Sequence, residues 1–279
     1  MGPVHLTVSD LERSLDYYRT VVGLDVLEQG GGRASLGADS TELLGLVEEP
    51  GAEPSDGYTG LYHFALLVPD RPSLGRWLAH AARDRVPLSG LSDHYVSEAI
   101  YLRDPDRHGI EIYADRPRQL WEGQVGRRMT TEPLDVDDLL READGEFDGL
   151  PAGTTMGHVH LKVASIPATV DFYRDVLGFD LVVERVPQAA FLSAGGYHHH
   201  LGANTWESAG APPPPDRSAA LRHATIVLPS VEARDEVVRR VAETGQTPTD
   251  TSTGPLVRDP SGNALVLTAT ADPASAQTQ

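Results

Sequence analysis

The sequence contains no cysteine and a single lysine, Lys162, among its 279 residues. The missing thiols exclude disulfide bonds, zinc–thiolate sites and thiol catalysis together. No apolar run reaches the roughly 18–20 residues of a membrane span, and no basic stretch leads into an apolar one near the N-terminus. We therefore expect a cytoplasmic protein without a membrane partner.

Positive charge is also scarce, because 23 basic residues face 41 acidic ones and the formal net charge is −18. Such a surface repels nucleic acid as well as anionic membranes. The use of arginine in place of lysine is what a GC-rich genome produces. Together with the acidic excess it also fits a protein adapted to high salt, where self-repulsion is screened. We treat halophily as a hypothesis, which full activity and an unchanged melting temperature in dilute buffer would contradict.

An internal repeat organises the chain. Residues 4–27 match residues 159–182 at an offset of 155, and further matches join 61–69 to 221–229 and 103–113 to 258–268. The repeat predicts two copies of one domain, at residues 1–118 and 154–271. The acidic segment between them, residues 119–153, is expected to be a linker with a short helix near 136–143, and residues 272–279 a disordered tail.

Each copy is itself double. Leu11, Leu15, Tyr18 and Val22 recur at helical spacing after a strand at residues 4–8, with Ser9 or Asp10 as the cap and Gly23 as the stop. The other expected elements of the first copy are strands near 24–28, 33–37, 42–48, 61–68, 97–102 and 110–113, and a helix near 74–85. This order predicts an α+β fold of four β-α-β-β-β units, paired into two domains with curved mixed sheets.

Three polar side chains interrupt the apolar faces of these strands. Alternation places His5 opposite Val4 and Leu6, His63 opposite Phe64, and Glu111 opposite Ile110 and Ile112. A carboxylate on the inner face of a curved sheet needs a cation, a proton or another partner. Two histidines and one carboxylate are the side chains of a facial metal site.

The same stretches carry a family resemblance. The repeated units, together with DHYVSEAIYLRDPDRHGIEIY (93–113), MTTEPLDVDDLL (129–140) and GYHHHLGANTW (196–206), resemble the vicinal oxygen chelate superfamily of glyoxalases, bleomycin-resistance proteins and extradiol dioxygenases. Within it the chain is similar to two-domain catechol 2,3-dioxygenases. The resemblance implies metal ligands on the first strands of two paired units and on the last strand of one of them, which are the positions of His5, His63 and Glu111.

The second copy serves as an internal comparison. Its counterparts of the three residues are His160, His223 and Val266, so a complete triad is expected only in the N-terminal copy. His158 has no counterpart in the first copy, and we interpret it as structural or surface-exposed.

The resemblance implies an extradiol dioxygenase that uses Fe(II) to cleave a catechol-like aromatic diol with dioxygen. Three ligands on one face of the ion leave room for both substrates. The alternatives are a glyoxalase-like enzyme that uses Zn or Ni, with Glu42, Glu48 or Glu49 as a further carboxylate, and a binding protein without activity. Mn is a further alternative to Fe(II), and a homo-oligomer is left open.

Acid–base chemistry points to two residues. Tyr101 lies ten residues before Glu111, where the resemblance implies an active-site tyrosine, and His94 lies in the loop before that strand. His198, His199 and His200 align with the fourth strand of their unit, and we interpret them as structural or interface residues, with a second metal site together with His160 and His223 as the alternative. A serine hydrolase and a nucleotide-binding protein are excluded, because the G-x-S-x-G and P-loop motifs are missing.

Overall fold

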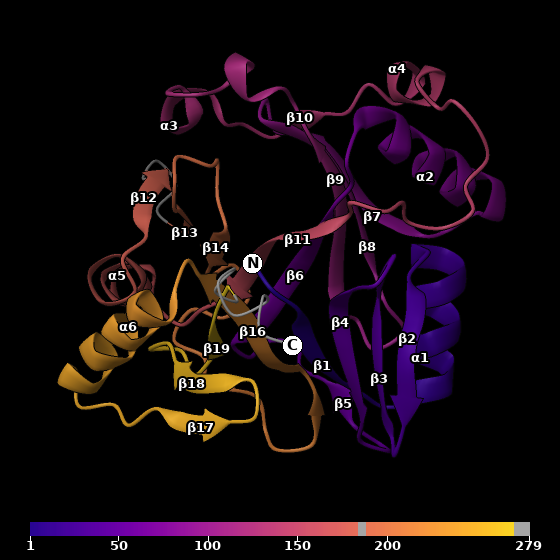
Figure 1. The fold of residues 1–279 in the computed structure, drawn as a ribbon. Helices are drawn as coiled ribbons and strands as arrows, with labels where there is room; N and C mark the ends of the chain where they lie inside the picture. The colour runs from indigo at the N-terminus through magenta and orange to yellow at the C-terminus, as the bar shows by residue number, and fades with distance from the viewer. Residues whose placement is uncertain (184–187, 271–279) are drawn as a thin grey trace, which may run out of the picture.

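The structure is a computed structural model that describes residues 1–183 and 188–270 (Figure 1). All four β-α-β-β-β units are present in it. The first comprises β1 (Val4–Val8), α1 (Leu11–Tyr17) with the π-helical turn η1 (Tyr18–Val22), β2 (Asp25–Gly30), β3 (Arg33–Ala38) and β4 (Thr41–Glu48). The second comprises β6 (Gly60–Leu67), α2 (Arg71–Asp84), β7 (Leu88–Asp93), β8 (Ser97–Arg103) and β9 (Gly109–Asp115).

The second copy repeats this order. The third unit comprises β11 (Thr155–Lys162), α5 (Ile166–Asp171) with η3 (Phe172–Val176), β12 (Asp180–Val183), β13 (Ala189–Ser193) and β14 (Leu201–Asn204). The fourth comprises β16 (Leu221–Leu228), α6 (Val231–Glu243), β17 (Thr249–Thr251), β18 (Gly254–Arg258) and β19 (Ala264–Ala269). The short strands β5 (Glu53–Pro54) and β15 (Ser218–Ala219) pair with each other.

The first helix begins and ends where its sequence predicts. The Asp10 side chain accepts a hydrogen bond from the backbone N–H of Arg13, which satisfies one of the free donors at the helix start. Gly23 follows η1 with a φ of 91°, a left-handed conformation that glycine adopts without strain. Leu11, Leu15 and Tyr18 lie on the buried side between these two ends.

The strands form two large sheets. The eight-stranded sheet has the order β17-β18-β19-β16-β1-β4-β3-β2, and the nine-stranded sheet has the order β10-β7-β8-β9-β6-β11-β14-β13-β12, where β10 is Glu132–Pro133. The helices lie on the outside of these sheets (Figure 1). The α+β class and the mixed, curved sheets predicted from the sequence are thus confirmed.

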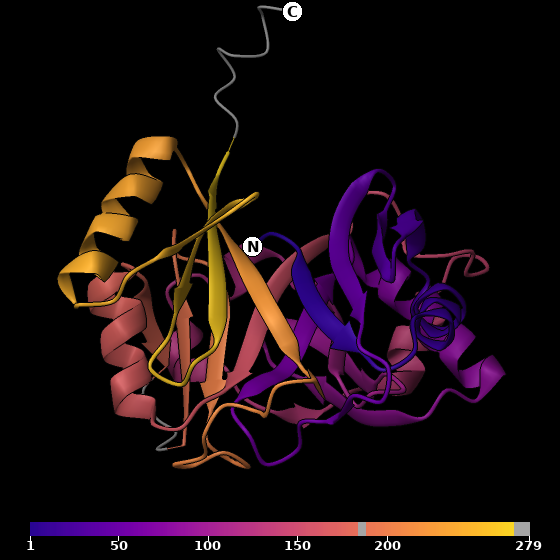
Figure 2. The ribbon, with the colours of Figure 1, turned by 90° about the horizontal axis from the view of Figure 1, so that it is seen from below.

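The pairing of the units differs from the prediction. β1 pairs antiparallel with β16, and β6 pairs antiparallel with β11, so unit 1 shares a sheet with unit 4 and unit 2 shares one with unit 3 (Figure 2). Hydrogen bonding therefore crosses between the copies at 1–118 and 154–271. All four first strands carry apolar residues around a histidine, and for this reason their sequences do not say which two lie side by side. We call the two sheets the 1/4 sheet and the 2/3 sheet.

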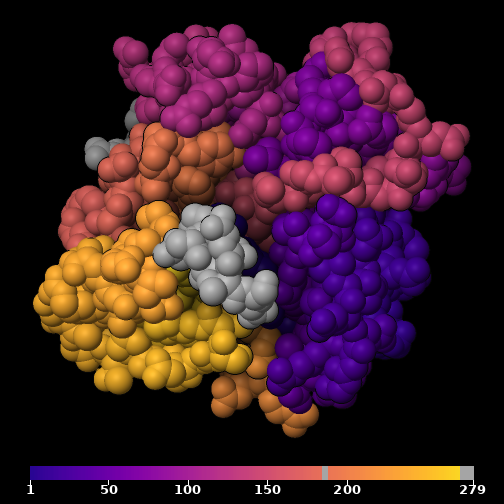
Figure 3. All heavy atoms as spheres, viewed as in Figure 1, coloured from indigo at the N-terminus to yellow at the C-terminus, as the bar shows by residue number. Residues whose placement is uncertain are grey.

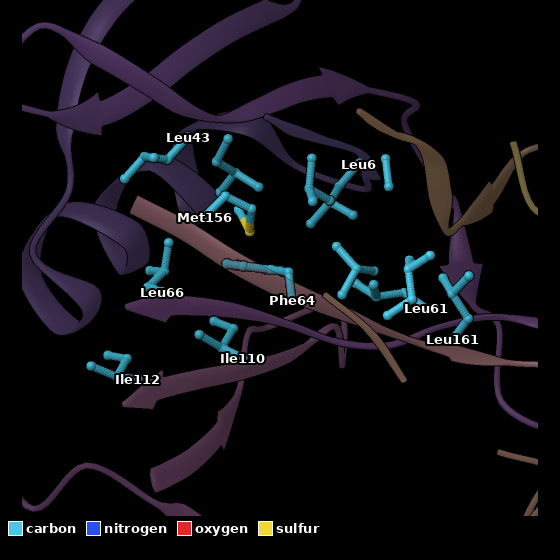
Figure 4. Packing of buried hydrophobic residues seen from close by; sticks show 14 of the residues in the cluster. Leu6, Leu43, Leu61, Phe64, Leu66, Ile110, Ile112, Met156 and Leu161 are labelled. Atoms are coloured by element: carbon cyan, nitrogen blue, oxygen red, sulfur yellow. The ribbon is translucent and has the colours of Figure 1, made fainter. Parts of the chain in front are cut away.

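A single apolar core joins the two sheets. Leu6 and Leu43 of the 1/4 sheet belong to the same buried cluster as Phe64, Ile110 and Met156 of the 2/3 sheet (Figure 4). Because strand side chains alternate, the residues between these apolar ones point to the opposite face of their sheet. The core thus determines which face of the 2/3 sheet receives the polar side chains.

The linker crosses the molecule from one outer element to another. It contains η2 (Arg118–Leu120), α3 (Val125–Arg128), β10 and α4 (Val136–Arg141), and it runs over the top of the view from beside β12 to beside α2 (Figures 1 and 3). The predicted helix near 136–143 corresponds to α4. The predicted tail at 272–279 lies outside the described residues. No described helix is both long and apolar enough to cross a membrane.

Candidate active site

Glu111 lies between two histidines on the inner face of the 2/3 sheet. Its Oε2 is 3.1 Å from His63 Nε2 and 3.2 Å from His158 Nε2. The exposed fractions of Glu111, His63 and His158 are 2%, 6% and 1%, so water screens this cluster very little. The three side chains come from β9, β6 and β11, which are neighbours in the sheet.

A β-bulge brings His158 into the cluster. The register between β11 and β6 shifts between Met156 and His158, and Gly157 is the extra residue. Met156 therefore lies in the apolar core, while His158 lies on the inner face together with His160. The sequence led us to expect that His158 is structural or surface-exposed. It is not surface-exposed, because it is buried against Glu111. A glycine before a histidine in a strand was the available signal for the bulge.

His5 does not join His63 and Glu111. It lies in the 1/4 sheet, directly across from His223, and the two rings stack with centroids 4.3 Å apart. Its Nε2 is 4.0 Å from Glu42, a half-exposed residue of the same sheet. The assignment of His5 to the triad fails because unit 2 pairs with unit 3, so that β11 rather than β1 lies beside β6.

The 1/4 sheet lacks the corresponding cluster. At the repeat offset of 155, the counterparts of His158 and Glu111 are Pro3 and Val266, neither of which can bind a metal. Val266 is buried, with an exposed fraction of 1%. Besides the carboxylate, the 1/4 sheet therefore also lacks a counterpart of the His158 ligand.

The pKa shifts of Glu111 and His158 suit a metal site. Burial raises the pKa of Glu111, but the neighbouring His158 and His63 lower it more, and the pKa lies well below its usual value of 4.5. Burial lowers the pKa of His158 in spite of the opposing attraction of Glu111. An ionised carboxylate and neutral imidazoles are the forms in which these side chains bind metal ions.

The positions of the nitrogen and oxygen atoms in the cluster also fit a metal site. The ligand atoms of His63, Glu111 and His158 all lie within 4.8 Å of one another. His63 Nε2 is buried, and its 3.1 Å contact with Glu111 Oε2 lacks the geometry of a hydrogen bond, so binding a metal would break no hydrogen bond of this nitrogen among the described residues. Two imidazoles and a carboxylate on one face are a donor set for divalent iron and related metals. The residues therefore fit a metal ion.

The cluster opens into a cavity of about 940 Å³. Aromatic side chains form part of its wall: Tyr62, Phe191 and Trp206. Three arginines also line it: Arg103, Arg127 and Arg128. Glu111 is the only carboxylate among the described lining residues, so the cavity is locally cationic in a protein of net charge −18.

Tyr101 and His94 form a hydrogen-bonded pair in this cavity. Tyr101 lies directly across from Glu111 in the pairing of β8 with β9, and its Oη is 2.7 Å from His94 Nε2. His94 Nδ1 is 2.7 Å from the carbonyl oxygen of Thr130, which can only accept, so Nδ1 carries the proton. In the neutral ring Nε2 then accepts from the tyrosine hydroxyl. Burial and the charge of Glu111 raise the pKa of Tyr101 well above its usual value of 10.

The run of three histidines contributes one residue to the cavity. The run precedes β14 instead of lying on it, which corrects the expected strand placement. His199 lines the cavity, and its ring centroid is 4.1 Å from that of His158. His200 Nδ1 accepts a hydrogen bond from the backbone N–H of Ala194, a local contact that holds the turn. Sequence reasoning missed His199, because the alternation rule applies within strands and not before them.

The comparisons with known proteins agree with this fold. Residues 1–112 and 155–267 match the model of the Glyoxalase/Bleomycin resistance protein/Dioxygenase superfamily. The chain is 44% identical over 273 residues to catechol-2,3-dioxygenase of Bacillus subtilis (strain 168), which covers 95% of each chain.

Solved structures show the same architecture. A 17% identical crystal structure from Bacillus subtilis subsp. subtilis str. 168 has a TM-score of 0.65, with 98% of this chain and 86% of that one covered. Glyoxalase I from Zea mays, also 17% identical, has a TM-score of 0.60, with 96% and 91% covered. At this level of identity the likeness concerns the fold.

Proposed function

The chain belongs to the Glyoxalase/Bleomycin resistance protein/Dioxygenase superfamily, and on this basis we propose that it is a metal-dependent dioxygenase that opens the ring of a catechol-like diol. The observation that carries the proposal is the convergence of His63, Glu111 and His158 at the base of an aromatic cavity. The name of the 44% identical relative, catechol-2,3-dioxygenase, supports the same reaction.

We propose Fe(II) as the metal, held by His63, Glu111 and His158. When bound, a ferrous ion with three protein ligands on one face supplies open positions for both diol oxygens and for dioxygen. The single carboxylate among the ligands leaves net positive charge, which favours an ionised diol.

Around this position the side chains of the protein have separate tasks. Phe191 and Trp206 form an apolar wall for the ring of the substrate and exclude water from it. Tyr101 directs its proton to His94 Nε2 and leaves its oxygen lone pairs for a hydroxyl of the diol. His199 supplies the base that accepts the proton of the other diol hydroxyl. His94 acts through Tyr101, since both of its nitrogens are already bonded.

The glyoxalase-like alternative has less support from this geometry. It calls for a second carboxylate near the metal, and Glu111 is the only one lining the cavity within the described residues. The three candidates considered from the sequence lie elsewhere. Glu42 is next to His5, Glu48 accepts a hydrogen bond from the N–H of Leu11, and Glu49 pairs with Arg217.

Anaerobic purification with metal analysis, followed by a catechol assay, tests the proposal. We expect about one iron per chain, uptake of dioxygen and a yellow ring-fission product. Zinc or nickel in place of iron, with no dioxygen uptake across a panel of catechols, would refute the dioxygenase assignment.

Substitutions test the ligand set separately. Glu111→Ala and His158→Ala should each lose the metal. His5→Ala is the matched control, because this histidine lies in the 1/4 sheet. If His5→Ala lost the metal and His158→Ala kept it, the proposed ligand set would be wrong whatever the reaction is.

A further inference from the structure

A chain of hydrogen bonds that starts at the partly exposed Asp115 ends at the cavity. Asp115, the last residue of β9, has its Oδ1 2.8 Å from His198 Nε2, and His198 Nδ1 is 2.8 Å from His199 Nδ1. The exposed fractions of His198 and His199 are 0% and 5%. The chain thus links a carboxylate outside the cavity to a histidine that lines it.

The carboxylate also has a second fixed partner. The Tyr197 hydroxyl donates to Asp115 Oδ2 at 2.9 Å, and its oxygen is 2.9 Å from the Tyr113 hydroxyl. Because Tyr197 has one proton and gives it to Asp115, Tyr113 must be the donor in the second bond. Each carboxylate oxygen of Asp115 therefore has its own donor.

An ionised Asp115 and a neutral His198 together set the direction of every proton in the chain. An ionised Asp115 can only accept, so His198 carries its proton on Nε2. A neutral His198 then has a lone pair on Nδ1, and His199 must donate from its own Nδ1. The remaining nitrogen of His199, Nε2, is left with a lone pair on a residue that lines the cavity.

We propose that Asp115 and His198 are positioning residues that hold His199 in the tautomer with an unprotonated Nε2. This inference rests on the proposed function, in which His199 accepts a proton from the diol. Neither positioning residue touches the substrate; both act through His199. An aspartate that fixes the tautomer of a histidine base is a known way to make that base effective.

The matched pair His198→Phe and His198→Asn separates hydrogen bonding from packing. Phenylalanine keeps a ring but offers no acceptor to His199 Nδ1. Asparagine places its side-chain oxygen close to where Nδ1 of the histidine lies, so it can still accept. Asp115→Asn tests the charge that orders the chain, and His200→Asn is a neighbouring control outside it.

The first readout is the tautomer itself. Nitrogen-15 NMR of histidine-labelled, zinc-loaded protein should show His199 protonated at Nδ1 and His198 at Nε2. The His199 proton should move to Nε2 in His198→Phe and stay on Nδ1 in His198→Asn. Asp115→Asn should lower the fraction of His198 protonated at Nε2. A wild-type His198 that carries both protons, or a His199 protonated at Nε2, would overturn the proposal, as would unchanged tautomers in Asp115→Asn.

The second readout is the kinetics of the iron-loaded enzyme with catechol. His198→Phe should lower kcat by roughly 10²-fold with KM and metal content within about twofold, since a positioned base contributes about that factor. His198→Asn should recover most of this loss, and His200→Asn should stay near wild type. An unchanged kcat in His198→Phe would refute the role. If wild type cleaved no member of the catechol panel, the proposed function would fail while the NMR result still decided the tautomer.

Discussion

Gly157→Ala is expected to destabilise the protein although it adds only one methyl group. Gly157 is the bulged residue of β11, and a Cβ there would lie 1.9 Å from Tyr113 Oη and 2.7 Å from Cζ. Ordinary contact begins near 3.4 Å, so the methyl group overlaps the hydroxyl by about 1.5 Å. Tyr113 is 0% exposed and bonded to Tyr197, which prevents its ring from moving away freely.

The size of the effect follows from these contacts. Overpacking a dense interior costs about 1–3 kcal/mol, and loss of the Tyr113–Tyr197 hydrogen bond costs about 1 kcal/mol more. For a chain of 279 residues, a loss of about 2–4 kcal/mol lowers Tm by roughly 3–7 °C. Because the bulge presents His158, metal affinity should fall as well.

Thermal unfolding followed by circular dichroism measures this loss. Gly30→Ala is the matched control, since a Cβ at this glycine would meet nothing within 4 Å, and it should change stability by less than about 0.5 kcal/mol. The double variant with Tyr113→Phe removes the overlapping hydroxyl and should recover part of the lost stability. A wild-type Tm in Gly157→Ala, or no recovery in the double variant, would refute this account of the bulge.

Three further outcomes are expected. Tyr101→Phe should keep the metal and lower kcat by roughly 10²-fold in the catechol assay, because the substrate loses its partner in the cavity. Arg127→Gln should lower kcat/KM for a carboxylated catechol more than for catechol, because arginines outnumber carboxylates in the cavity lining; an equal loss for both would contradict this. Asp106→Asn should cost about 1–2 kcal/mol at pH 7 in urea unfolding, because Asp106 binds Ser9 and Arg13. Burial raises the pKa of Asp106, but these partners leave it below 3.8, so the stabilisation is present above that pH and the gap to the variant should close as the pH falls through the folded pKa.

The alternation of strand side chains was sufficient to predict two members of the cluster. Ile110 and Ile112 are in the core, as expected, and this turns Glu111 to the other face of the sheet. His63 follows from Phe64 in the same way. Within one strand the period of two is local, so it does not depend on which strands become neighbours.

Strand pairing and irregular backbone were beyond the same reasoning. His158 became a neighbour of Glu111 because β11 lies beside β6, a contact between residues about a hundred positions apart, and because one bulge shifts the register. His199 reaches the cavity from a segment before β14, where no period constrains the side chain. The positions of both residues depend on strand pairing and irregular backbone. The internal repeat of the sequence does not specify either of these features.

The two sheets show why a histidine at the same strand position in both copies need not be a metal ligand. His160 faces His63 across β11 and β6, as His5 faces His223 across β1 and β16. Each pair also has a glycine beside it: a Cβ on Gly202 would lie 2.7 Å from His160 Nδ1, and one on Gly45 would lie 2.2 Å from His5 Nδ1.

In both sheets a histidine ring packs over a glycine. This arrangement is a packing feature of the fold, because the 1/4 sheet has it without a metal cluster among its described residues. The residues that differ between the sheets are His158 and Glu111, which become Pro3 and Val266. Packing constrains both copies equally, whereas metal binding needs only one of them. In this protein the differences between the copies therefore locate two of the three proposed ligands, His158 and Glu111, whereas of the paired histidines only His63 belongs to the cluster.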